Sequence, residues 1–234
     1  VTAAVTENLE KFELGMAVRK LYDFIWDDFC DWYIELAKIR MNGADEESAD
    51  SARRVLVWTM SNTLKLLHPF MPYITEEIWQ TLPHDGEALI VAKWPEYDEA
   101  LSFPQEAKNL ENVMALIRAI RTRRNEMNVP PSKKAHIYID TAHPAPYEEA
   151  SEFIARLAYG SKVEIGTGFD VQGAVTAVTD DAKALLPMDD LVDKAAETAR
   201  LNKELANAQK QLDTVKAKLA NEKFTSKAPQ NVID

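Results

Sequence analysis

Hydrophobic and polar positions alternate along much of this chain with the 3.6-residue period of an α-helix, most clearly over Leu21–Arg40. On a helical wheel of 100° per residue, its apolar positions fall on one wide face. They are Tyr22, Ile25, Trp26, Phe29, Trp32, Tyr33 and Leu36. Asp23, Asp27, Asp31 and Glu35 recur every fourth residue on a different face, here called the acidic ridge. The pattern predicts a long amphipathic helix with an aromatic core side.

The same spacing predicts other helices. They are expected within Thr6–Met41, with or without a break near Gly15, and at Ser51–Phe70, Tyr73–Leu82 and Gln105–Asn128. Ser48 or Asp50 is expected to cap the helix that follows it. Residues 83–104 are predicted to form a connection with a short strand at Ala88–Ala92. Trp26, Trp32, Trp58 and Trp79 are expected in the core, and Trp94 in a more open position.

The pattern changes to a period of two after residue 134. The run HIYID at 136–140 alternates, Pro144–Tyr159 has helical spacing, and three further short apolar runs follow it. Those runs are KVEIG, Val171–Val178 and AKALLPM. They predict a small β-α-β-β-β module, whose glycines mark turns and do not form a phosphate-binding fingerprint.

From Leu191 the spacing becomes that of a coiled coil. Apolar positions separated by four and three residues form a heptad seam: Leu201, Leu205, Ala208, Leu212, Val215 and Leu219. One arm cannot bury its own seam. We therefore expect the chain to be a fragment that lacks a second arm, with Pro229 opening the returning helix; self-association through the seam is the alternative.

These patterns predict a mainly α fold: a helical bundle at residues 1–134, a small α/β module at 135–190 and a coiled-coil helix at 191–234. Composition agrees, because only 7 glycines are present and no apolar run has the roughly 20 residues of a membrane span. One cysteine excludes an internal disulfide and a cysteine-cluster zinc site. With no secretory signal pattern at the start, a cytoplasmic location is expected.

The net charge of −11 is unevenly distributed. Residues 1–100 hold 19 acidic and 9 basic side chains, and residues 135–197 hold 12 and 4. Residues 101–134 and 198–233 reverse the sign, each with 7 basic and 3 acidic side chains. Two basic segments in an acidic chain predict local contacts with a polyanion.

The first basic segment contains a cluster here called the basic island: Arg118, Arg121, Arg123, Arg124, Lys133 and Lys134. The helix macrodipole accounts for only one or two cations at a helix C-terminus. Arg124 falls on the apolar stripe of its helix and Arg121 on its edge. The two arginines are expected either to pair with the acidic ridge or to face a bound phosphate.

An enzymatic hypothesis centres on Asp27, Asp28 and Asp31. The cluster lacks a nearby histidine and a glycine-bearing calcium loop, so a solvated or salt-bridged acidic face is favoured over a metal or acid/base site. No catalytic residue and no metal ligand are therefore assigned.

Four motifs carry a resemblance over nearly the whole chain: LYDFIWDDFCDWYIELAK (Leu21–Lys38), LLHPFMPYITEEIWQTLP (Leu66–Pro83), the run Arg121–Lys134, and KLANEKFTSKAP (Lys218–Pro229). Together, in this order, they resemble the C-terminal part of the bacterial valyl-tRNA synthetase family. The resemblance implies a helical anticodon-binding domain at 1–134, a junction module at 135–190 and the first arm of a tRNA-binding coiled coil at 191–234.

The resemblance also implies partners and a reaction. The parent enzyme of this family joins valine to tRNA(Val) with ATP and Mg, is monomeric, and holds its catalytic and editing domains N-terminal to this region. The chain alone is expected to bind tRNA(Val), to pack on that catalytic core, to need no cofactor or membrane, and to be inactive in aminoacylation.

Candidate RNA-binding residues follow from the two basic segments. They are Arg118, Arg121, Arg123, Arg124, Lys133, Lys134, Arg200, Lys203, Lys210, Lys216 and Lys218. Arg121 and Arg124 are the first choices for phosphate contacts near the anticodon stem, and the lysine face of the last helix is expected to contact phosphates without regard to sequence. The rival hypothesis is a structural helical module that self-associates through its heptad seam.

Overall fold

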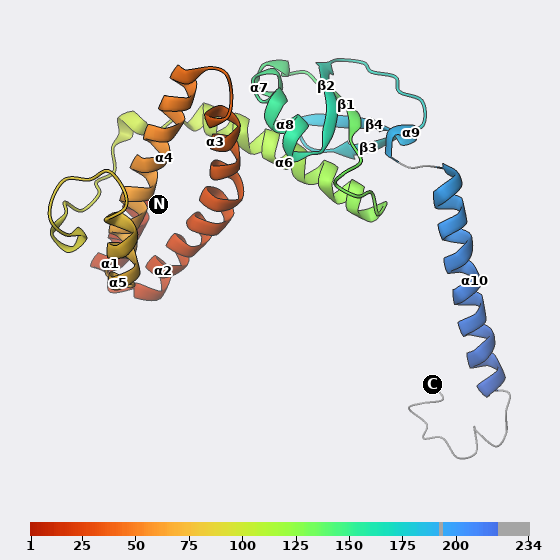
Figure 1. Ribbon diagram of the computed structural model, residues 1–234, viewed down its shortest axis with the longest axis horizontal. Helices are drawn as coiled ribbons and strands as arrows, with labels where there is room; N and C mark the ends of the chain where they lie inside the picture. The colour runs from red at the N-terminus through yellow and green to blue at the C-terminus, as the bar shows by residue number, and fades with distance from the viewer. Residues whose placement is uncertain (192–193, 220–234) are drawn as a thin grey trace. The chain divides into compact units, whose positions relative to one another are not determined.

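A computed structural model describes residues 1–191 and 194–219 of the chain (Figure 1). The chain divides into two compact units, residues 1–107 and residues 108–234. Helices dominate both, and the described part contains one four-stranded sheet, which confirms the predicted mainly α fold with a small α/β module. The predicted domain limits at 134 and 190 stay a prediction, since the two units divide inside a helix.

The first unit is a set of packed helices. Its elements are α1 (Thr2–Glu10), α2 (Leu14–Asp23), the π-helix η1 (Phe24–Tyr33), α3 (Ile34–Met41), α4 (Glu46–Leu67), α5 (Pro72–Trp79) and the 3-10 turns η2 (Leu89–Val91) and η3 (Glu99–Leu101). α1 packs on α2, α3 on α4, and α4 on α5. The first break lies at residues 11–13, where Phe12 has a φ of 57°, and not at Gly15, which is inside α2.

The middle of the stretch Leu21–Arg40 is π-helical, which its sequence spacing did not predict. A π-helix bonds residue i to i+5, so its faces turn away from those of an α-helix. Phe29 and Trp32 are buried as expected. Tyr22 and Trp26 are 55% and 54% exposed, so their predicted core position was wrong.

Within the acidic ridge, two members bond to neighbours on their own helical segment. Arg19 Nε lies 2.8 Å from a carboxylate oxygen of Asp23, and Lys38 Nζ lies 2.5 Å from Glu35. Such exposed pairs contribute only about 0.3–0.5 kcal/mol each. The ridge is a solvated, partly paired face at these two positions.

Two details of the first unit correct the sequence prediction. α4 is capped by Asp45, whose carboxylate accepts from the backbone N–H groups of Glu47 and Ser48, and not by Ser48 or Asp50. The predicted strand at Ala88–Ala92 is the 3-10 turn η2, because Leu89 turns inward and is 3% exposed.

The first unit has two buried apolar clusters. One joins α1, α2 and α4 through Val5, Ala17, Leu21 and Leu66. The other joins α4, α5 and η2 through Leu64, Trp79 and Leu89. η2 therefore owes its position to the burial of one leucine between two helices.

The second unit is built around the sheet. Its elements are α6 (Pro104–Glu126, from residue 108), β1 (Ala135–Thr141), α7 (Pro144–Glu149), α8 (Ser151–Leu157), β2 (Gly160–Gly166), β3 (Ala174–Val178), β4 (Ala182–Pro187), α9 (Met188–Leu191) and α10 (Lys194–Leu219). The strand order is β2-β1-β4-β3, with β1 parallel to β2 and the other pairs antiparallel. The predicted sequence of strands is confirmed, and the single helix predicted at Pro144–Tyr159 is two short helices, α7 and α8.

α6 runs along the sheet and α7 and α8 lie at its β2 end (Figure 1). The apolar stripe of α6 is buried at Val113, Leu116, Ile117 and Ile120. β1 alternates between buried and half-buried positions along its whole length, as its period of two predicts.

α10 extends through residue 219, and where its side chains are described they are exposed. Leu205, Leu212 and Val215 of the heptad seam are 68%, 46% and 52% exposed. The side chains of Leu201 and Leu219, and the predicted returning helix at Pro229, lie outside the described residues. In the part of the chain that is described, no helix is long and apolar enough to span a membrane.

Candidate nucleic-acid interface

The basic island forms where α6 ends and the chain turns back into β1. α6 stops at Glu126, Asn128 adopts a left-handed φ of 54°, and Val129 N–H donates to the carbonyl of Arg124 at 2.9 Å. Left-handed residues of this kind commonly close a helix C-terminus. The turn returns Lys133 to the end of the helix.

Arg124 is an internal residue, with 2% of its surface exposed. Its Nη2 donates to the carbonyl of Pro130 at 3.2 Å and also to that of Lys133. Its Nε and Nη1 have no hydrogen-bond partner among the described atoms, and the Tyr159 ring lies 5.4 Å from its guanidinium carbon. Burial lowers the pKa of Arg124 from its ordinary value. Arg124 therefore holds the turn that follows α6 against the end of that helix.

Arg121 and Arg123 bind the backbone of the α/β module. Arg121 Nε donates to the carbonyl of Leu157 at 2.6 Å, at the end of α8. Arg123 Nε donates to the carbonyl of Thr176 in β3 at 3.1 Å, and its Nη1 lies 2.9 Å from Glu126. These three arginines therefore bind acceptors of their own unit.

Other members of the island face outward. Arg118 and Lys134 are exposed and Lys133 is half-buried. In α10, Lys210 and Lys216 are exposed as well, whereas the side chains of Arg200, Lys203 and Lys218 lie outside the described residues. The exposed cations are the ones geometrically available to a polyanion.

A family model described as "Anticodon-binding domain of tRNA ligase" matches residues 1–139, more than half of the chain. The chain belongs to the anticodon-binding domain family of tRNA ligases. A second model, described as "Valyl tRNA synthetase tRNA binding arm", matches residues 193–234. The basic island therefore lies inside the anticodon-binding domain match, and the α10 lysines lie inside the arm match.

Curated relatives agree with both matches. The chain is 43% identical over 234 residues to the Valine--tRNA ligase of Staphylococcus saprophyticus, covering 98% of this chain and 27% of that protein. It is 44% identical to the Valine--tRNA ligase of Listeria innocua and 41% identical to that of Bacillus subtilis, covering 26% and 27% of them. The chain thus spans about a quarter of their length. The sequence resemblance to valyl-tRNA synthetases is confirmed.

The described residues give no support to a metal or acid/base site at Asp27, Asp28 and Asp31. No group of three or more His, Cys, Asp or Glu side chains that could hold a metal is present among the described residues. Asp27 and Asp31 are exposed, as expected of a solvated face.

One surface of the anticodon-binding unit was missed by the sequence prediction. Trp58, expected in the core, is 56% exposed on α4 and lines two hollows of about 550 and 540 Å³. Asn62 and Lys65 line both hollows as well. The sequence could have indicated that Trp58 is exposed, because positions 58, 62 and 65 share one helical face with Arg54 and that face is otherwise polar.

Proposed function

We propose that this chain is the tRNA-recognition part of a valine–tRNA ligase. The helical anticodon-binding unit binds the anticodon region of tRNA(Val), and the α10 arm binds the tRNA body. The observation that carries the proposal is the position of the two basic segments of this acidic chain: residues 101–134 and 198–233 each lie within a stretch that matches a tRNA-binding family.

The geometry supports two different roles within the basic island, one structural and one in RNA binding. Arg121, Arg123 and Arg124 hold α6 to the module and to the turn, which fixes the backbone that displays the outward cations. Lys133 and Lys134, with Arg118, then neutralise RNA phosphates. Phosphate contacts of this kind set affinity and orientation, while loop bases supply sequence information.

Along α10, Lys210 and Lys216 bind phosphates of the tRNA body. Arg200, Lys203 and Lys218 are proposed to act in the same way. The joining of valine to tRNA(Val) with ATP and Mg is assigned to a catalytic core that this chain does not contain, so the chain alone binds tRNA without charging it.

The test is a titration of the chain with tRNA(Val) and a non-cognate tRNA at several salt concentrations. Replacing Lys133 and Lys134 by Ala should weaken binding and lower the logarithmic salt slope by about two, one for each lost phosphate contact. The matched control is the double substitution of Lys162 and Lys183, two cations of the same unit outside the island. An unchanged slope in the island variant, or no binding of tRNA by the parent chain, would overturn the proposal.

A second candidate function is self-association through the heptad seam, favoured by the exposure of Leu205, Leu212 and Val215. It predicts a mass that rises with protein concentration and no preference for tRNA(Val). Sedimentation of the chain over a hundredfold concentration range, with and without tRNA, separates the two functions.

A further inference from the structure

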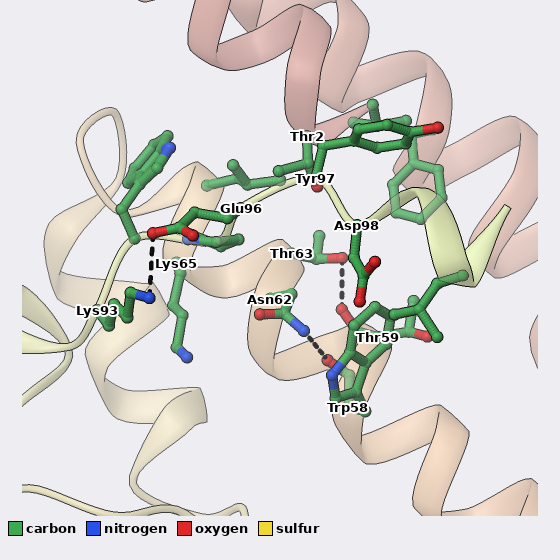
Figure 2. A pocket seen from close by; sticks show the side chains of 16 residues that line it. Thr2, Trp58, Thr59, Asn62, Thr63, Lys65, Lys93, Glu96, Tyr97 and Asp98 are labelled. Carbon is green, nitrogen blue, oxygen red and sulfur yellow. Dashed lines mark hydrogen bonds and ion pairs between the residues drawn. The ribbon is translucent and has the colours of Figure 1, made fainter.

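α4 presents one polar and aromatic face that neither the core nor the basic island uses. Arg54, Trp58, Asn62 and Lys65 follow one another at spacings of four, four and three residues, which places them on one side of the helix. This set is called the α4 face. It borders the two hollows described above, and Figure 2 shows the one of about 550 Å³, with Trp58 and Lys65 among its lining residues.

The larger hollow offers a flat apolar surface together with hydrogen-bonding groups. The indole of Trp58 is more than half exposed there, and Tyr97, 61% exposed, belongs to the same lining. Asn62 Nδ2 donates to the carbonyl of Trp58 at 2.9 Å, which fixes the amide beside the indole. Asp98 lines the same hollow, as Figure 2 shows, and one of its carboxylate oxygens accepts from Ala100 N–H at 2.9 Å.

Charge distinguishes this face from the rest of the unit. Residues 1–100 carry 19 acidic and 9 basic side chains, yet four of those basic side chains line the two hollows. Arg53 is neutralised by Asp50 at 2.6 Å, and Lys93 by Glu96 at 3.0 Å. Arg54 and Lys65 form no ion pair with any described residue. Two unpaired cations therefore flank Trp58.

We propose that the α4 face binds unstacked nucleotides of a single-stranded RNA loop, with a base on Trp58 and the flanking phosphates at Arg54 and Lys65. Aromatic stacking combined with a cationic path is the usual chemistry of single-strand recognition. The two cations are separated by a helical rise of about 16 Å, so they contact different phosphates. The inference rests on the proposed function, since it assigns part of the anticodon-region contact to α4.

Asp98 supplies a hydrogen-bond acceptor in the same hollow. A carboxylate accepts from the exocyclic amino groups and from the ring N–H groups of RNA bases. Its proposed role is therefore to orient a base that is stacked on Trp58.

The experiment measures binding of a fluorescent anticodon stem-loop, and of whole tRNA, to the full chain. Trp58→Ala should weaken stem-loop binding about 5- to 100-fold, the effect of losing one base–aromatic stack, while Trp58→Phe should largely retain binding. Tyr73→Ala is the matched control, because Tyr73 is 90% exposed on α5 and lines neither hollow. Equal affinities of Trp58→Ala and Tyr73→Ala would overturn the inference.

A second measurement decides the case in which Trp58→Ala does not fold. The folded Trp58→Phe variant should lose most of the RNA-induced quenching of tryptophan fluorescence; quenching equal to that of the parent chain would overturn the inference and leave the face to a protein partner. If the Trp58 variants bind RNA like the parent chain while the Lys133/Lys134 variant binds more weakly, the inference about the α4 face is wrong and the proposed function stands. If the parent chain does not bind tRNA, both the proposed function and the inference are wrong.

Discussion

The guanidinium carbon of Arg124 lies 5.4 Å from the centre of the Tyr159 ring, at the junction of α6 with the sheet. Tyr159 has a left-handed φ of 58°, and its carbonyl accepts from Ala135 N–H at 3.2 Å at the start of β1. One cation thus joins the end of α6, the turn before β1 and the end of α8. The negative face of the aromatic ring partly offsets the cost of burying guanidinium N–H groups that lack a hydrogen-bond acceptor.

Replacing Arg124 by Ala should lower the free energy of unfolding by about 2–3 kcal/mol, because two charge-assisted hydrogen bonds and the packing of a buried side chain are lost. Arg124→Lys keeps the charge without the planar fork, so an intermediate loss is expected. Urea unfolding measures both. Lys134→Ala, at an exposed position of the same turn, should change stability by less than about 0.5 kcal/mol. An effect that small for Arg124→Ala would contradict the conclusion that Arg124 holds the turn.

The sequence predicted that Arg124 is unusual but not what it binds. Its place on the apolar stripe of α6 follows from spacing alone. Its acceptors are backbone carbonyls of residues 130 and 133, brought back by the left-handed turn at Asn128. Backbone acceptors have no sequence signature, so the alternatives considered were the charged ones: a carboxylate or a phosphate.

Two glycines, one in each unit, test the packing inside that unit. A Cβ at Gly160 would lie 2.9 Å from Ile137 Cδ1 and 3.2 Å from Ala155 Cα, so Gly160→Ala forces α8 away from β1 and should cost about 1–3 kcal/mol. Gly15, inside α2, has open space around its missing Cβ. Gly15→Ala should instead stabilise the chain by about 0.4–1 kcal/mol. Thermal unfolding of both variants should give shifts of opposite sign; equal signs would contradict the assigned packing.

Elements whose form depends on the spacing of their own residues could be predicted from the sequence, and elements whose form depends on contacts with distant residues could not. The strands of the second unit and α4, α5 and α6 follow from periodicity, since each buries one face. η1 and η2 do not. Trp26 lies inside the π-helix, which displaces it from the core side, and Leu89 forms a single turn because it fills a space between Leu64 and Trp79. Both depend on tertiary packing.

Glu76 gives the first unit a pH dependence. Gln80 Nε2 donates to its carboxylate at 2.7 Å and Leu89 N–H at 2.8 Å. The bond from Gln80 is the main cause that lowers the pKa of Glu76, and the Leu89 N–H adds to it against partial desolvation. A lowered pKa in the folded state means that the carboxylate stabilises the fold above the ordinary carboxyl pKa and loses this effect as pH falls through the lowered value.

The stability advantage of the parent chain over Glu76→Gln should therefore be constant near pH 7 and shrink between about pH 5 and pH 3. Melting temperatures across that range measure it. Glu77→Gln, at the exposed neighbouring position, serves as the control. An advantage that persists unchanged at pH 3 would mean that the contact between Glu76 and η2 does not depend on the carboxylate charge.

The last prediction separates the two faces of α10. Lys210 and Lys216 are exposed, as are Leu205 and Leu212 of the heptad seam. Replacing both lysines by Ala should lower the logarithmic salt slope of tRNA binding by about two and weaken cognate and non-cognate tRNA alike, because phosphate contacts carry no base information. Replacing both leucines by Asn should leave that slope unchanged. Reduced self-association in the leucine variant, together with an unchanged slope in the lysine variant, would assign α10 to protein pairing instead of RNA.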